Sequence, residues 1–189
     1  IIDSLFGKAY ATQQRNKMNT GVVIDWRASP GNYQYLKELS DKLQHATLAK
    51  IVVNMKKCME KHSPYYREAA SAVDTLEEVV ARDHELSATI VSIIDDKNVS
   101  AVLDFLDELK AMNHPVYFVG KVTRADRVYM EVRSLVLPSS FGTISFPIKV
   151  YRNRVRGDGV PYAPDFVYNG DMDDTESLEK FVELVLKKI

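Results

Sequence analysis

Hydrophobic positions along the chain follow two different periods, and their alternation predicts an α/β protein. Leu36, Leu39 and Leu43 recur at helical spacing, whereas short β-branched runs such as 88–94 are typical of strands buried on both faces. The predicted strands are 21–26, 50–55, 88–94, 116–122, 148–153 and 165–169. The predicted helices are 33–46, 64–85, one capped by Asn98 that ends before Asn113, 125–137, and one that begins at Asp173 or Asp174.

Strands and helices alternate from Lys50 onward, which favours a mainly parallel sheet covered by helices on both faces. This pattern predicts two regions, an N-terminal extension over 1–47 and a main domain over 48–189. Residues 1–20 show no sustained period, so we expect an extended arm that becomes ordered on a partner and anchors the protein there. A short strand and a helix complete the extension.

Composition narrows the class of protein. The 189 residues carry a formal net charge of −1, which argues against a domain wholly committed to nucleic acid. Cys58 is the single cysteine, so no intramolecular disulfide can form. No window approaches the ~18 apolar residues of a membrane-spanning helix. The chain begins at Ile1 without a recognisable targeting segment, so we expect a processed form or a trimmed piece.

The segment FGTISFPIKVYRN, residues 141–153, places Pro147 at the start of a predicted strand. The Phe146–Pro147 bond is of the kind in which the cis form costs little. Together with VYFVGKV (116–122) and FVYNG (166–170), this segment resembles the thioredoxin superfamily over residues 48–189, in particular protein disulfide isomerase domains. The resemblance implies a three-layer α/β/α sandwich with a mixed central sheet and a cis proline at Pro147.

The redox pair of that family has no counterpart in this chain. The resemblance aligns Asp96, Lys97, Asn98 and Val99 with the family's CxxC motif, and thiol exchange needs a thiolate that these side chains cannot supply. A rival alignment places the segment VIDWRASPGNYQYLKEL (23–39) at the redox site, and it has no cysteine either. The resemblance therefore implies a redox-inactive protein. Its binding surface would be formed by Ser145, Phe146 and Pro147 together with Asp96, Lys97, Asn98 and Val99.

Two further groups of residues carry candidate chemistry. Cys58 lies among Lys56, Lys57, Lys61 and His62, which can lower a thiol pKa, although an unremarkable thiol is the favoured interpretation. Lys149, Arg152, Arg154 and Arg156 form a basic cluster that suits RNA or an acidic protein surface. We favour a solvated hairpin there, because acidic residues dilute the charge and no aromatic platform is interleaved. No metal site, catalytic constellation or cofactor is expected.

The favoured function is a structural or protein-binding subunit of a larger assembly, for which we expect a mitochondrial location. One alternative is a noncatalytic chaperone of disulfide-isomerase type in the lumen of the endoplasmic reticulum, and a cytoplasmic location is also left open. Another is a glutathione-dependent or thiol-dependent enzyme that uses Cys58. Protein partners are expected ahead of nucleic acid.

Overall fold

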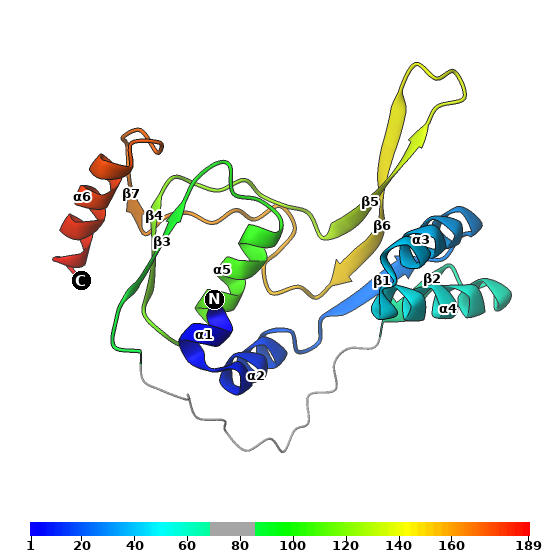
Figure 1. Ribbon diagram of the computed structural model, residues 1–189, viewed down its shortest axis with the longest axis horizontal. Coiled ribbons are helices and arrows are strands. Elements are labelled where there is room, and N and C mark those ends of the chain that lie inside the picture. Colours follow the sequence, from blue (N-terminus) through cyan, green and yellow to red (C-terminus); the bar gives the residue numbers. More distant parts are fainter. Residues whose placement is uncertain (69–85) are drawn as a thin grey trace. The chain divides into compact units, whose positions relative to one another are not determined.

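A computed structural model describes residues 1–68 and 86–189, and it divides the chain into two compact units (Figure 1). The first unit comprises Ile1–Asn19, Val73–Asp126 and Arg156–Ile189. The second unit comprises Thr20–Ala72 and Arg127–Val155. The described residues form both helices and strands, with one antiparallel and one parallel sheet, which confirms the α/β class.

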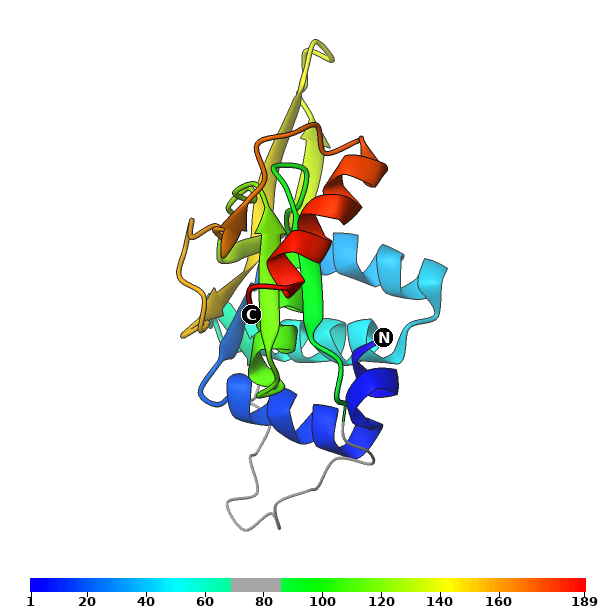
Figure 2. The ribbon, with the colours of Figure 1, turned by 90° about the vertical axis from the view of Figure 1, so that its left-hand side faces the viewer.

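The first unit contains the parallel sheet. Strands β3 (Ile90–Ile94), β4 (Val116–Gly120) and β7 (Phe166–Val167) pair in that order. Helices α5 (Ala101–Ala111) and α6 (Thr175–Leu186) lie on opposite sides of this sheet (Figures 1 and 2). Gly120 ends β4 with a φ of 130°, and a Cβ at this position would lie 2.1 Å from the Ile94 carbonyl oxygen. A glycine is therefore required where β4 passes the end of β3.

The N-terminal residues are helical, and the prediction of an extended arm over 1–20 is wrong. Helices α1 (Ile2–Phe6) and α2 (Lys8–Met18) contribute Ile2, Phe6 and Tyr10 to the hydrophobic core that they share with α5. The Tyr10 hydroxyl donates a hydrogen bond of 3.0 Å to the Met112 carbonyl. The scattered apolar residues of this segment lie inside the first unit because α5 supplies the surface that they need.

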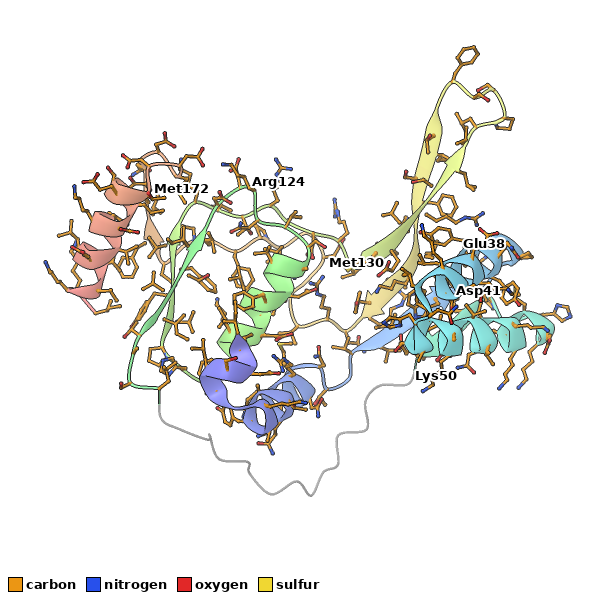
Figure 3. All side chains as sticks on the ribbon, viewed as in Figure 1. Glu38, Asp41, Lys50, Arg124, Met130 and Met172 are labelled. Carbon is orange, nitrogen blue, oxygen red and sulfur yellow. The ribbon has the colours of Figure 1, made fainter. Side chains whose placement is uncertain are left out.

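The second unit is built around an antiparallel sheet of four strands in the order β2-β1-β6-β5. The strands are β1 (Val23–Arg27), β2 (Tyr65–Glu68), β5 (Tyr129–Val136) and β6 (Thr143–Arg152). Helices α3 (Pro30–Leu43) and α4 (Ala46–Glu60) connect β1 to β2 and bury Leu36 and Met55 against Trp26. Polar residues of these helices, including Glu38, Asp41 and Lys50, are exposed (Figure 3).

Two elements of the predicted alternation have the wrong type. Residues 50–55 were expected to form a strand because they are β-branched, yet Ile51, Val52 and Met55 have helical spacing and are buried on one face of α4. The expected helix over 125–137 is strand β5, which forms a hairpin with β6. A turn-forming segment, Pro138 to Gly142, separates the two β-rich stretches, and this arrangement is the sequence signal of a hairpin.

The expected helix over 64–85 is also wrong at its start, because Tyr65–Glu68 form β2, which pairs with β1. Residues 69–85 of that prediction lie outside the described residues. Asn98 does not cap α5, since its side chain accepts a hydrogen bond from the Asp95 amide and the N-cap residue is Ser100.

Other predictions are confirmed by the structure. The strands expected near 21–26, 88–94, 116–122 and 165–169 are β1, β3, β4 and β7, and the helix expected over 33–46 is α3. Asp174 caps α6 and accepts a hydrogen bond from the Ser177 amide.

Residues 47 and 48, the predicted domain boundary, both lie within α4. Among the described helices, none has the length and apolar character needed to cross a membrane.

Candidate binding site

One face of the antiparallel sheet carries a row of side chains that crosses all four strands. Arg67 of β2 is opposite Asp25 of β1, which is opposite Val150 of β6, which in turn is opposite Tyr129 of β5. Directly opposed residues of antiparallel strands project from the same face. Arg27 and Arg152 lie two positions from Asp25 and Val150, so they share this face.

Asp25 binds the side chains of two arginines on this face. Its carboxylate accepts hydrogen bonds from Arg67 Nε and Nη2 at 2.8 and 2.9 Å, and from Arg152 Nε at 3.2 Å. The hydrogen bonds from Arg67 lower the pKa of Asp25, burial opposes this effect, and Arg152 adds to the lowering. The Asp25 side chain is only 4% exposed, whereas those of Arg67 and Arg152 are 66% and 46% exposed. One buried carboxylate therefore holds two solvent-facing guanidinium groups in fixed positions.

A shallow pocket of about 340 Å³ opens on the same face. It is lined by Asp25, Arg27, Tyr65, Tyr129, Pro147, Ile148, Lys149, Val150 and Arg152, all of which belong to the second unit. The Arg27 guanidinium lies over the Tyr65 ring, 5.2 Å from its centroid. Tyr65 and Tyr129 are 41% and 55% exposed. The pocket therefore combines exposed aromatic rings with cationic groups.

Pro147 lies in the middle of β6, opposite Val132, and not at the start of a strand as predicted. Every peptide bond between described residues is trans, so the expected cis proline at Phe146–Pro147 is wrong. The register between β1 and β6 ends at Trp26 and Lys149, before Pro147 is reached. The proline therefore occupies a part of β6 where β1 no longer pairs, which is where a strand tolerates a missing N–H.

The predicted binding surface is divided between the two units. Ser145, Phe146 and Pro147 lie on β6 in the second unit, whereas Asp96, Lys97, Asn98 and Val99 follow β3 in the first. Lys97 forms an exposed ion pair of 3.1 Å with Asp173. A single surface formed by both groups stays a prediction, and of these residues Pro147 alone lines the pocket.

The predicted basic cluster is also divided. Arg152 faces the pocket, and Arg154 lies over the Tyr151 ring. Lys149 also lines the pocket, and its ammonium lies 5.1 Å from the Trp26 ring centroid and pairs with Glu131 at 3.0 Å. Arg156 belongs to the first unit and is buried, where it pairs with Asp104, Asp107 and Asp126. Arg156 cannot take part in an exposed patch because three carboxylates enclose it.

The sequence did not indicate Asp25, Arg27, Tyr65 or Tyr129 as site residues. Tyr65 and Tyr129 fell within expected helices, so the sheet face that they share was not anticipated. We expected no aromatic residues interleaved with the basic ones. This expectation is wrong, because Tyr65 and Tyr129 line the pocket together with the arginines. The available signal was the two-residue spacing of Asp25 and Arg27 in VIDWR and of Tyr65 and Arg67 in YYRE, which places each pair on one face of a strand.

Cys58 lies on α4, half-buried against the core that contains Trp26 and Met55. The part of the chain that the structure describes contains no group of three or more His, Cys, Asp or Glu side chains that could hold a metal ion. The unremarkable thiol stays the favoured prediction for Cys58, and a reactive role stays the alternative.

A second exposed feature is the hairpin of β5 and β6, which extends beyond α3 and α4 (Figure 1). Its apolar side chains are unusually exposed: Phe141 is 98% exposed and Val136 is 69% exposed. Val132, Leu135, Leu137 and Ile144 are each at least 40% exposed. Monomeric soluble proteins rarely expose many apolar side chains together, so this feature favours a contact with another molecule.

No protein-family model, curated protein or solved structure matches this chain. The functional argument therefore depends on the geometry of the described residues.

Proposed function

We propose that this protein is a noncatalytic, protein-binding subunit of a larger assembly and that the β5–β6 hairpin inserts into a partner protein. The observation that supports this function is the exposure of Phe141, Val136 and Ile144 on one projecting hairpin. Burying such side chains contributes about 1.5–3 kcal/mol each. Phenylalanine, the residue exposed at the tip, is one of the aromatic residues enriched in the cores of protein interfaces.

Both faces of the hairpin carry apolar residues. Leu135 is opposite Ile144 and projects from one face, whereas Val136 is opposite Thr143 and projects from the other. A hairpin that is apolar on both faces suits insertion between elements of a partner better than docking onto a flat surface.

The test is co-purification of tagged protein from its native source, followed by size-exclusion chromatography. The wild-type chain is expected to elute in a stoichiometric complex. A variant with Val136→Lys and Phe141→Lys is expected to elute as a folded monomer, because two ammonium groups would have to be buried in the interface.

Leu184→Lys is the matched control, since Leu184 is 56% exposed on α6 in the first unit. It should leave the complex intact. A hairpin variant that remains in the complex would contradict the proposal, as would a wild-type chain that elutes alone. Transient binding to denatured clients instead of a defined complex would favour the chaperone alternative.

A redox-inactive, thioredoxin-like relationship is part of this proposal for the first unit. It is supported by the β3-α5-β4 succession, in which β3 and β4 are parallel, and by the helices on the two sides of their sheet. An experimental structure tests it. Superposition of the β3-α5-β4 segment and α6 on a thioredoxin domain would support the relationship, and a different arrangement of these elements would contradict it. A mitochondrial location stays a prediction.

A further inference from the structure

We propose that the pocket-bearing face of the antiparallel sheet binds single-stranded nucleic acid. Arg27 and Arg152 would contact phosphates, and Tyr65 and Tyr129 would stack on bases. This role goes beyond protein binding by the hairpin and uses different residues.

The charge of the face favours an anionic ligand. The guanidinium groups of Arg27, Arg67 and Arg152 share the face with the carboxylate of Asp25, and the nearby Glu131 carboxylate is paired with Lys149. Because Asp25 already orients Arg67 and Arg152, little conformational entropy is lost when they contact a phosphate. Guanidinium groups suit phosphate oxygens because their donors are arranged in a planar fork.

The aromatic residues favour a ligand that also carries bases. Tyr65 and Tyr129 are exposed on the face that carries the arginines, and Arg27 supports the Tyr65 ring from one side. A base stacked on an exposed aromatic ring contributes about 1–3 kcal/mol, whatever the base. An acidic peptide would use the arginines and leave both rings without a role.

The spacing of the tyrosines favours a polymer over a free nucleotide. Tyr65 lies on β2 and Tyr129 on β5, the two outer strands of the sheet. Three inter-strand steps of about 4.8 Å place these strands about 14 Å apart. One base cannot stack on both rings, whereas a strand that crosses the sheet presents several bases with phosphates between them.

Fluorescence anisotropy with the full chain and a labelled oligouridylate of about 12 nucleotides tests the proposal. Tyr129→Ala is expected to weaken binding about 5- to 150-fold, the range that corresponds to one lost stacking contact. Tyr129→Phe should restore binding because it keeps the ring. Arg27→Gln should weaken binding and reduce the slope of log K against log salt concentration by about one.

Two control variants separate this face from other surfaces. Arg124→Ala removes an exposed positive charge from the first unit (Figure 3), and Phe141→Ala removes an exposed ring from the hairpin tip. Both should bind the oligonucleotide as the wild-type chain does. Phe141→Ala also keeps the two proposals distinguishable, since it should weaken assembly and leave the sheet face unchanged.

Several outcomes would overturn the inference. The wild-type chain could fail to bind the oligonucleotide at low salt. Alternatively, Tyr129→Ala could bind the oligonucleotide as tightly as the wild-type chain. Equal affinity for polyglutamate would indicate an acidic protein ligand, and equal affinity for uridine monophosphate would indicate a free-nucleotide site.

Discussion

Asp25 shows how strongly a single residue depends on its partners in this protein. Its carboxylate is buried, and the exposed side chains of Arg67 and Arg152 supply its hydrogen bonds. We expect Asp25→Asn to lower the free energy of unfolding at pH 7 by about 1–3 kcal/mol, because charge-assisted hydrogen bonds are lost. Urea denaturation of the variant and of the exposed control Asp96→Asn measures this effect. A variant as stable as the control would contradict it.

The pH dependence follows from the direction of the pKa change. The pKa of Asp25 is lower in the folded chain than the ordinary aspartate value of 3.8. The carboxylate therefore contributes stability that is fully present above the unfolded pKa and is lost as pH falls through the folded pKa. Urea midpoints measured between pH 7 and pH 2 should decline less steeply below about pH 4 for Asp25→Asn than for the wild-type chain. Parallel curves would contradict this assignment.

At the scale of elements, α4 shows why local composition misled the prediction. Its β-branched residues favour a strand, but burial of Ile51, Val52 and Met55 against Trp26 and Leu36 favours a helix. The tertiary contact outweighs the local preference, which amounts to a few tenths of a kcal/mol per residue. Strand β5 is the opposite case, because its apolar spacing predicts a helix and pairing with β6 makes it a strand.

The helix in α4 can be tested with two neighbouring residues. Met55 is fully buried, so Met55→Ala should cost about 2–5 kcal/mol in the free energy of unfolding. Val53 is 54% exposed, so Val53→Ala should be neutral or slightly stabilising, because alanine has the higher helix propensity. Chemical denaturation of both variants measures the difference. A large loss from Val53→Ala would contradict the assigned face of α4.

At the scale of the whole molecule, the N-terminal helices belong to the core of a unit whose other parts come from distant segments. Phe6 is fully buried and packs edge-on against His114, with ring centroids 5.6 Å apart. Phe6→Ala should lower the free energy of unfolding of the first unit by about 3–5 kcal/mol and increase amide hydrogen exchange in α5. Lys8→Ala, at an exposed position of α2, is the control. If exchange in α5 did not change, the N-terminal segment would be peripheral after all.

The sequence by itself determined the α/β class, most of the short strands and the amphipathic helices α3, α5 and α6, because hydrophobic periodicity is a local property. Only the tertiary structure decided the types of α4 and β5, the place of α1 and α2 in a core and the division into two sheets. It also brought Asp25, Arg27, Tyr65 and Tyr129 onto one face. These features depend on contacts between residues far apart in sequence. Their free energy comes from burial and pairing, which no local pattern records.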